Sequence, residues 1–365
     1  MNPLVELQSY GQSFWYDNIR RKLLLDGTVK KLIVDDGLRG MTSNPSIFDQ
    51  AIGQSDDYDD QLFDLSSKGL SVKDVYEKLA IYDIRLACDM FKNLYSSSNG
   101  GDGYVSLEVS PHLAHKTSET IEEALRLFST VDRPNLMIKV PATEAGIPAV
   151  AELLGRGINI NVTLMFSMDH YLSIANAYID GLDKWLAGNG EAEKVASVAS
   201  FFVSRVDTDV DALLSATGIP VAGELRGKTA VANSKIVYQR FKEIFYGDRF
   251  RPLAKAGVRP QRLLWASTST KNPDYPDTMY IDDLIGSETV NTMPPKTIDA
   301  FRDHGRLSSS LEEGIDEAQS ILDRVEDMGL SLDEITSQLQ EKGVKAFADS
   351  FDQLISTLTN KLDRS

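Results

Sequence analysis

Alternating apolar and polar positions divide the chain into a repeated succession of short strands and longer helices. Runs with a two-residue period predict strands, and runs with apolar spacings of three and four predict helices. The clearest helical patterns are SVKDVYEKLAIYDIRLACDMFKNLY at 71–95 and SMDHYLSIANAYIDGLDKWLAG at 167–188. The predicted strands are Phe14–Asp17, Leu38–Thr42, Tyr104–Val109, Leu136–Val140, Ile158–Leu164, Val195–Val203, Leu263–Ser267 and Thr289–Thr292.

Eight strands that alternate with helices predict an α/β fold, a (β/α)8 TIM barrel with extra helices and long loops on the catalytic rim. A doubly wound open sheet is the main rival. Such sheets usually begin with a glycine-rich turn after the first strand, and none appears near Phe14–Asp17. We expect residues 1–365 to form a single domain, because barrels of ~250 residues or more commonly fold as one unit.

Three further segments bear on that rim. Residues 49–69 are rich in Asp and Ser, and residues 268–288 follow the seventh strand. Both are interpreted as insertions that act either as lids or as surface decoration. A C-terminal helix is predicted at about 346–362, with apolar residues at helical spacing. It either packs on the barrel, covers the active site or contacts another subunit.

Within several strands, polar residues share the face that would point into the barrel lumen. Ser106 and Glu108 share one face of YVSLEV, and Asn161 and Thr163 share one face of INVTL. Polar residues therefore fall at the carboxyl ends of strands, where barrel enzymes keep their chemistry.

Composition and charge narrow the function. A net charge of −16 disfavours nucleic acid and anionic membranes, so we expect neither as a partner. An anionic substrate would need a local cluster of basic residues. The single cysteine, Cys88, excludes an intramolecular disulfide and is interpreted as a small buried hydrophobe. With no apolar run of ~18 residues and no signal-peptide pattern at the N-terminus, we expect a cytoplasmic protein.

Lys139 is the strongest candidate for chemistry, since it lies in LMIKVPAT, a strand with no other charge. Lysine is rarely buried unless it is paired, and burial favours the neutral amine that attacks a carbonyl. The resulting imine accepts electrons when the adjacent C–C bond breaks. The alternative is a strand-end lysine whose amine reaches solvent.

Carboxylates and hydroxyls near such a lysine would serve its proton transfers. Glu108 lies on a strand, although a salt-bridge role is the alternative. Asp17 ends the aromatic strand FWYD, where it could instead cap a following helix. Thr163 and Asn161 could orient a water or hydroxyl, or could satisfy backbone groups at a strand end.

Two more groups of residues suit a sugar phosphate. In RGMTSNPSIF, Thr42 and Asn44 could bind hydroxyls, although an Asn-Pro turn is the alternative. Arg205 and Lys271, just past the sixth and seventh strands, could bind an anion. A metal site is not expected, because the three-residue spacing of His112 and His115 has no third ligand nearby in sequence.

The order of these motifs resembles the transaldolase family, in its longer bacterial branch. The resemblance runs from about Leu4 to the last helix and is carried by TSNPSIF, VSLEVSP, LMIKVPAT, INVTLMFS, SFFVSRVDTDVD and LLWASTSTKNP. It implies that Lys139 forms the Schiff base, that Asp17 is the acid or base at the bond being broken, and that Glu108 and Thr163 hold a catalytic water.

The resemblance also implies the substrate contacts. Asn44 and Ser200 resemble the residues that hold the dihydroxyacetone hydroxyls, and Phe202 matches an aromatic typical of transaldolases where related fructose-6-phosphate aldolases carry a tyrosine. Arg205 and Ser267 resemble phosphate-binding residues. Many members have a second phosphate arginine shortly after that serine, whereas this chain has Lys271.

The implied reaction moves a dihydroxyacetone unit from sedoheptulose 7-phosphate or fructose 6-phosphate to glyceraldehyde 3-phosphate or erythrose 4-phosphate, as in the pentose phosphate pathway. No cofactor is implied, because the imine is the electron sink. A true aldolase on the same scaffold and a catalytically silent binding barrel are the alternatives. The protein is expected to be a monomer or a homodimer.

Overall fold

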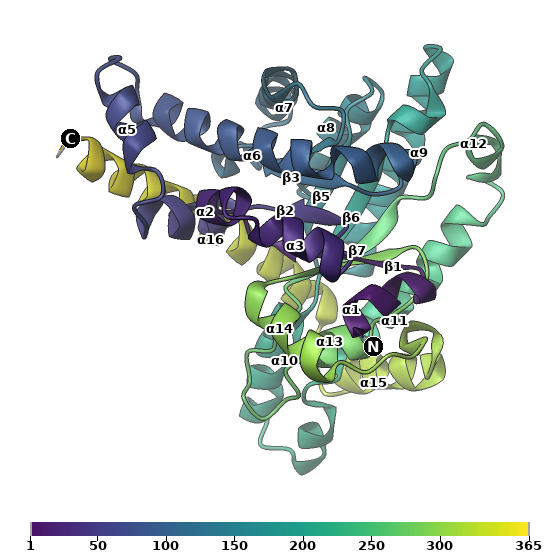
Figure 1. The fold of residues 1–365 in the computed structure, drawn as a ribbon. Helices are drawn as coiled ribbons and strands as arrows, with labels where there is room; N and C mark the ends of the chain where they lie inside the picture. The colour runs from purple at the N-terminus through teal and green to yellow at the C-terminus, as the bar shows by residue number, and fades with distance from the viewer. Residues whose placement is uncertain (1, 364–365) are drawn as a thin grey trace.

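The computed structural model describes residues 2–363 and contains a closed barrel of eight parallel strands in sequential order (Figure 1). The last strand pairs with the first, with Ser13 opposite Val290 and Trp15 opposite Thr292. The strands are β1 Gln12–Asp17, β2 Gly40–Thr42, β3 Tyr104–Glu108, β4 Leu136–Pro141, β5 Ile160–Met165, β6 Ser197–Phe202, β7 Arg262–Ala266 and β8 Thr289–Met293. The predicted fold class is therefore confirmed, and each predicted strand overlaps an observed one.

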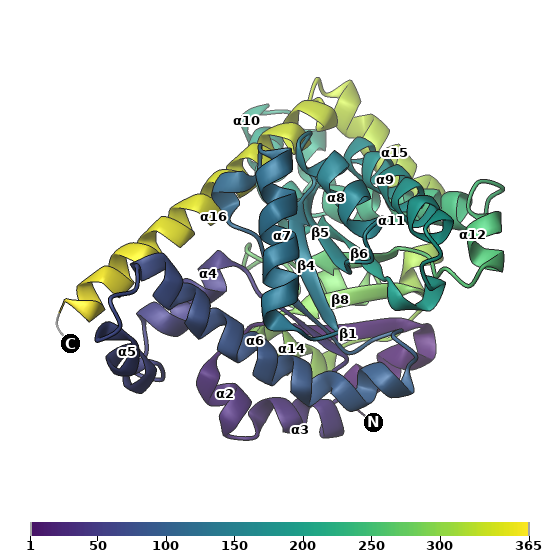
Figure 2. The same ribbon diagram turned by 90° about the horizontal axis from the view of Figure 1, so that it is seen from above.

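Helices surround the barrel (Figure 2). The α-helices are α1 Pro3–Glu6, α2 Arg21–Leu25, α3 Thr28–Asp35, α4 Pro45–Phe48, α5 Asp59–Ser66, α6 Val72–Ser97, α7 Thr117–Val131, α8 Gly146–Leu154, α9 Met168–Ala187, α10 Ser204–Ala216, α11 Thr229–Phe245, α12 Arg251–Lys255, α13 Met279–Asp282, α14 Pro295–His304, α15 Ile315–Asp327 and α16 Leu332–Leu362. Short π or 3₁₀ turns are η1 Leu7–Tyr10, η2 Asp49–Gly53, η3 Pro111–Leu113, η4 Ala192–Lys194, η5 Pro220–Leu225 and η6 Ser310–Glu312. No helix within residues 2–363 is long and apolar enough to cross a membrane.

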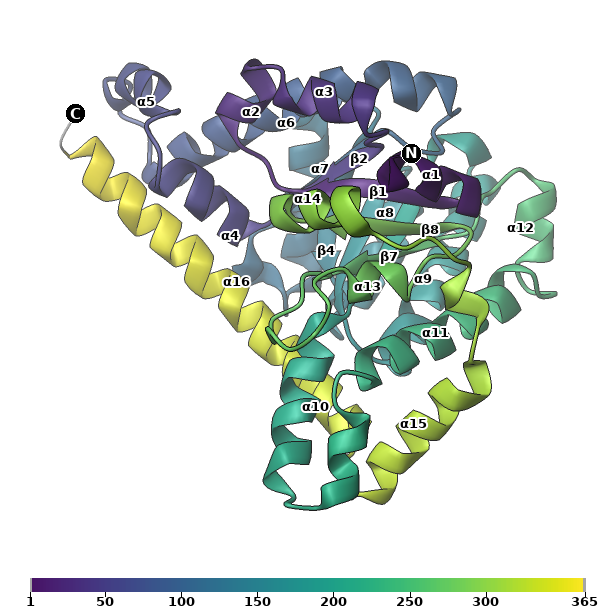
Figure 3. The same ribbon diagram turned by 60° about the horizontal axis from the view of Figure 1, so that its bottom comes forward.

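The C-terminal helix is longer than predicted. It begins at Leu332 rather than near residue 346, because Ser331 caps it by accepting a hydrogen bond from the Glu334 N–H. Figure 3 shows α16 running along one side of the molecule, from near α10 to the C-terminus beside α5. Gln340 on α16 donates to the carbonyls of Ala142 and Leu164, 2.9 and 3.0 Å away, and so joins the helix to the ends of β4 and β5.

The two predicted insertions differ in structure. Residues 49–69 are mostly helical rather than a long loop, since η2 and α5 occupy most of them. Acidic residues in the first turn of α5 favour the helix end, and buried Leu62 and Leu65 hold its inner face. Residues 268–288 contain only the short helix α13 and are otherwise turns.

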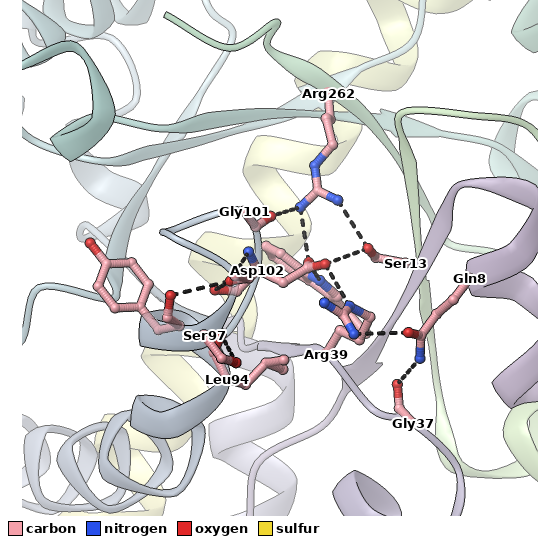
Figure 4. A network of polar contacts seen from close by, with 12 residues as sticks. Gln8, Ser13, Gly37, Arg39, Leu94, Ser97, Gly101, Asp102 and Arg262 are labelled. Carbon is pink, nitrogen blue, oxygen red and sulfur yellow. Dashed lines mark hydrogen bonds and ion pairs between the residues drawn. The ribbon is translucent and has the colours of Figure 1, made fainter. Parts of the chain in front are cut away.

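A network of polar contacts closes the barrel at the amino ends of its strands (Figure 4). Asp102 lies at its centre, 5% exposed, and pairs with Arg39 at 2.7 Å and Arg262 at 3.0 Å. Its two oxygens also accept hydrogen bonds from Ser13 and from the indole of Trp15. Two guanidinium groups thus depend on one carboxylate.

Trp15 also explains a glycine in the neighbouring strand. A Cβ at Gly40 would lie 2.5 Å from an indole carbon of Trp15, which is closer than real contacts allow. The indole therefore occupies the space that a side chain on β2 would need.

Replacing Asp102 with asparagine is expected to lower the free energy of unfolding by about 3–5 kcal/mol, because it leaves two partly buried guanidinium groups without a carboxylate. Burial alone would raise the pKa of Asp102, but Arg262 and Arg39 together hold that pKa below its usual 3.8. The stabilisation is present above that value and is lost as the pH falls through the lower folded-state pKa. Urea unfolding at pH 7 and pH 3 measures both effects, and an equal loss at the two pH values would contradict the ionic origin.

Candidate active site

A cavity of about 300 Å³ opens at the carboxyl ends of the strands. The residues predicted to be catalytic or to bind substrate line it, except Glu108; Asn161, also a candidate for orienting a water, does not line it. Its lining residues are Asp17, Thr42, Asn44, Ser46, Ile47, Gln50, Lys139, Thr163, Ser200, Phe202, Arg205, Ala266, Ser267, Thr268, Ser269, Lys271, Thr292, Pro294 and Phe347. The predicted residues therefore converge on one site, although they come from seven different strands or the segments that follow them.

Lys139 lies inside the lumen on β4 and is only 5% exposed, so the alternative of an amine that reaches bulk solvent is wrong. Its Nζ lies 3.4 Å from Glu108 Oε2 and donates to the Ser43 carbonyl at 3.3 Å. The ring of Phe347 lies 5.4 Å from the same nitrogen. The amine is held between a carboxylate, a carbonyl and an aromatic face, and it opens onto the cavity.

Glu108 stands directly beside the lysine, because the two residues are partners in the β3–β4 register. Burial raises the pKa of Glu108, Lys139 opposes that shift, and the Asp17 charge adds to it. Glu108 Oε2 is paired with the ammonium but has no well-aligned hydrogen bond within residues 2–363. The salt-bridge alternative and a catalytic role are therefore compatible, since the ion pair leaves hydrogen-bonding capacity unused.

Thr163 faces the same lumen from β5, and its buried Oγ1 has no hydrogen-bond partner in the described part of the chain. The strand bulges next to it, where Leu164 adopts a φ of 60°. A buried hydroxyl without a partner is costly, and backbone strain of this kind is concentrated at functional sites. The Thr163 hydroxyl is therefore available to a ligand or a water.

Asp17 ends β1 and accepts a hydrogen bond from the Thr42 hydroxyl at 2.7 Å, and that hydroxyl also contacts Thr292 at 2.7 Å. Burial raises the pKa of Asp17, and the positive charges of Lys139 and Arg205 oppose the shift. The proposed capping role is wrong, since Arg20 occupies the cap position of α2. Asp17 instead points into the cavity.

A layer of polar side chains lies below the lysine. Asn161 donates to Ser106 at 3.0 Å and accepts from Ser200 at 2.7 Å, so these residues join β3, β5 and β6. The side chain of Asn161 therefore forms hydrogen bonds with other side chains in the lumen. The alternative, that it satisfies backbone groups at a strand end, is wrong. The layer fixes Ser200, whose hydroxyl also lines the cavity.

Asn44 caps a helix and also lines the cavity. Its side-chain oxygen accepts from the Ile47 N–H at 2.9 Å and caps α4, which begins with Pro45. Its amide nitrogen has no hydrogen-bond partner within residues 2–363, and the residue lines the cavity. The helix cap thus leaves the amide nitrogen of Asn44 available as a donor, and its binding of substrate hydroxyls stays a prediction.

The outer part of the cavity is basic. Arg205, at the start of α10, stacks its guanidinium 5.0 Å over the ring of Phe202 and has no carboxylate partner in the structurally described chain. Lys271 donates to Ser269 at 2.7 Å. Burial lowers the pKa of both Arg205 and Lys271, and their mutual repulsion adds to the shift at Lys271. Two unneutralised cations at one rim favour an anionic ligand.

Ser267 follows β7 in a left-handed conformation with a φ of 57°. Its hydroxyl contacts Ser204 at 2.9 Å, and its carbonyl accepts the Ser204 N–H at 3.1 Å. Ser267 is thereby fixed against the start of α10, beside Arg205.

Several cavity residues were not predicted from the sequence. Thr292 is a polar residue near the end of β8 and carries the same alternation signal as Thr163. Ser43 does not line the cavity, but its backbone carbonyl accepts a hydrogen bond from Lys139, and a backbone group has no side-chain signature. Phe347 comes from α16, whose apolar spacing predicted packing on the barrel, with a cover over the active site or a subunit contact as the alternatives. The helix packs on the barrel ends through Gln340, and its Phe347 also lines the cavity.

Other predicted features lie outside the cavity. Cys88 is fully buried, as expected, and burial raises the pKa of its thiol. His112 and His115 pair with Asp352 and Glu341 of α16, at 2.8 and 3.7 Å. The two histidines therefore help to attach the C-terminal helix.

The closed barrel and the polar, basic-rimmed cavity at the carboxyl ends of its strands define a (β/α)8-barrel enzyme. Residues 14–358 match the family model described as Transaldolase/Fructose-6-phosphate aldolase, and the chain belongs to this family. It is 48% identical to the transaldolase of Thiobacillus denitrificans over 358 residues, which are 98% of this chain and 100% of that relative. Identity to the transaldolases of Frankia alni and Thermobifida fusca is 44%, covering 99% or more of this chain and 98% of each relative.

Proposed function

We propose that the chain is a transaldolase that moves a dihydroxyacetone unit between sugar phosphates through a Schiff base on Lys139. Family membership over nearly the whole chain supports the transfer of an aldehyde or ketone group. The single observation that carries the Schiff base is the position of Lys139, whose buried amine lies beside Glu108 and faces the same cavity as Arg205.

The reaction begins when the Lys139 amine adds to the C2 carbonyl of a ketose phosphate and the carbinolamine loses water to form an imine. Glu108 and the Thr163 hydroxyl, which has no hydrogen-bond partner among residues 2–363, hold the water that enters and leaves these steps. Burial raises the pKa of Glu108 above its usual 4.5, which makes this carboxyl a better proton acceptor than an exposed glutamate.

Cleavage follows when Asp17 takes the proton from the C4 hydroxyl. The C3–C4 bond breaks, its electron pair moves into the imine, and an aldose phosphate leaves with the new carbonyl. The enamine of dihydroxyacetone stays on Lys139. It then attacks a second aldose phosphate, Asp17 returns the proton to the new hydroxyl, and hydrolysis of the imine releases the product.

Substrate contacts are assigned by position in the cavity. The Asn44 amide and the Ser200 hydroxyl, both on the lining, bind the hydroxyls of the dihydroxyacetone unit, and Thr42 orients Asp17. Arg205, Ser267 and Lys271 bind the phosphate, with two cations balancing its charge. The substrates are sedoheptulose 7-phosphate or fructose 6-phosphate as donor and glyceraldehyde 3-phosphate or erythrose 4-phosphate as acceptor, in the cytoplasm and in a monomer or homodimer.

The second candidate is a fructose-6-phosphate aldolase, because the family description covers both activities. The two differ in whether the enamine waits for an aldehyde or is protonated and released. Phe202 lines the cavity and its ring has no acidic proton to donate. This favours an enamine that persists until an acceptor aldehyde binds.

Fructose 6-phosphate supplied alone should therefore release free dihydroxyacetone at least about tenfold more slowly than the same enzyme transfers the unit to glyceraldehyde 3-phosphate. An enzymatic assay for free dihydroxyacetone, run with and without acceptor, measures both rates. Release that is equally fast without the acceptor would identify an aldolase instead.

A further inference from the structure

Two buried aspartates lie on the helix that begins beside Arg205. Asp207 and Asp211 are one turn apart on α10 and are 1% and 8% exposed. Neither has an ion-pair partner within residues 2–363. Buried carboxylates without a cation cost free energy, so these two need an explanation beyond packing.

Each aspartate joins the same two parts of the chain. Asp207 accepts the Tyr280 hydroxyl at 2.7 Å and the Ala230 N–H at 2.8 Å. Asp211 accepts the Tyr275 hydroxyl at 2.7 Å and the Gly227 N–H at 2.9 Å. One oxygen of each acid thus binds a tyrosine of the 268–288 segment, and the other binds backbone at the start of α11.

We use the name acid–tyrosine clasp for Asp207, Asp211, Tyr275 and Tyr280. The ring of Tyr275 packs against Gly227, where a Cβ would lie 2.7 Å from the ring carbon that carries the hydroxyl. Gly227 also has a φ of 71°, so a larger residue there would be strained as well as crowded. The clasp therefore fixes the 268–288 segment both by hydrogen bonds and by close packing.

The clasp connects the two cations of the cavity rim. Arg205 precedes Asp207 by two residues on the same helix, and Lys271 precedes Tyr275 by four residues on the same segment. None of the four clasp residues lines the cavity. Any effect on a ligand must therefore pass through the cavity residues that α10 and the 268–288 segment carry, and the charged ones among them are Arg205 and Lys271.

We propose that the acid–tyrosine clasp is a positioning device that holds Lys271 at a fixed distance from Arg205 and so sets the affinity for the phosphate group of the substrate. The inference rests on the proposed function, because it assumes that a sugar phosphate binds between these cations. It adds four residues that act on specificity without touching the substrate.

Tyr275→Phe tests the clasp because it removes one hydroxyl and keeps the ring against Gly227. We expect the KM for glyceraldehyde 3-phosphate to rise about tenfold, with kcat nearly unchanged and with no change in kcat/KM for unphosphorylated glyceraldehyde. Tyr280→Phe, which removes the hydroxyl bound to Asp207, should give the same pattern and serves as the second variant.

The matched control is Tyr58→Phe. Tyr58 also donates to a buried aspartate, Asp83, at 2.8 Å, but it lies between α2 and α6, away from the phosphate rim. This control should leave the KM ratio of the two acceptors unchanged. Equal losses with both acceptors in Tyr275→Phe, or no rise in KM for the phosphorylated one, would overturn the proposal.

Calorimetric measurement of inorganic phosphate binding tests the clasp independently of dihydroxyacetone transfer. Phosphate should bind about tenfold more weakly to Tyr275→Phe than to the wild type. If the wild type binds phosphate and the variant loses affinity while neither transfers dihydroxyacetone, the proposed function fails and the clasp stands. Equal phosphate affinity in the two proteins would reject the clasp, whatever the activity.

Discussion

Lys139→Met should lower the rate of dihydroxyacetone transfer by at least about 10⁴-fold, because methionine has no lone pair with which to form the imine. Borohydride added with fructose 6-phosphate reduces an imine to a stable secondary amine. The wild type should therefore gain the mass of the reduced adduct on the peptide that contains Lys139, and the variant should gain none. Intact-protein mass spectrometry followed by peptide mapping measures both.

The cavity provides its own control for this experiment. Lys271 lines the same space, and Lys271→Met removes an equal charge from the rim. We expect that variant to bind phosphorylated sugars more weakly and still to form the borohydride-trapped adduct. Trapping that persists in Lys139→Met, or that maps to Lys271, would place the imine elsewhere, and a wild type that traps nothing would favour a silent barrel.

The same substitution changes the charge balance of the lumen. The negative charge of Glu108 is partly balanced by the ammonium of Lys139, and burial already raises the pKa of the Glu108 carboxyl. Without the ammonium, Glu108 should take up a proton at a higher pH than in the wild type. The rise in the Glu108 pKa lessens the cost of an unpaired buried charge in the variant.

The fold and most of the cavity could be predicted because their signals repeat along the chain. The two-residue period in YVSLEV and INVTL placed Ser106, Glu108, Asn161 and Thr163 in the lumen, and the structure confirms it through the Ser106–Asn161 hydrogen bond and the Glu108–Lys139 pair. Parallel strands of a barrel bring their carboxyl ends together, so polar residues at those ends converge. Strand order and site therefore follow from local patterns.

What could not be predicted depends on contacts between distant parts of the chain. Phe347 lies more than 200 residues after Lys139 in the chain, and it reaches Lys139 because α16 crosses the ends of β4 and β5, where Gln340 attaches it. The clasp aspartates look like ordinary helix-surface acids in SRVDTDVD until the 268–288 segment covers them. Backbone groups such as the Ser43 carbonyl leave no trace in a side-chain pattern.

The two ends of the barrel differ in how their buried charged groups are paired. At the amino ends of the strands, Asp102 neutralises two arginines and accepts hydrogen bonds from Ser13 and Trp15. At the carboxyl ends, within residues 2–363, Arg205 has no carboxylate in an ion pair and the Thr163 hydroxyl has no hydrogen-bond partner, while Asp17 is buried near three cations. Unsatisfied groups of this kind lower stability and are retained where a ligand completes them.

Asp17→Asn should lower kcat about 10²- to 10⁴-fold while leaving the protein at least as stable as the wild type at pH 7. Asparagine can still accept the Thr42 hydrogen bond, but it cannot take the C4 proton as the carbon–carbon bond breaks. Burial raises the pKa of Asp17 in the folded protein above 3.8, so the folded state binds this proton more tightly than the unfolded chain does. The resulting contribution to stability is fully present below pH 3.8 and is lost as the pH rises through the folded-state pKa. At pH 7 the carboxylate is therefore a net cost, which asparagine removes.

The pH profile separates this role from a structural one. In the wild type, kcat/KM should fall on the acid side with an apparent pKa above 3.8, and Asp17→Asn should lose the part of that limb that belongs to Asp17. Glu108 also has a raised pKa, so the matched variant is Glu108→Gln, which should keep the Asp17 limb. Borohydride trapping should remain possible in Asp17→Asn, since imine formation precedes cleavage. A variant that melts earlier and loses trapping along with turnover would show that Asp17 supports the fold and not the cleavage step.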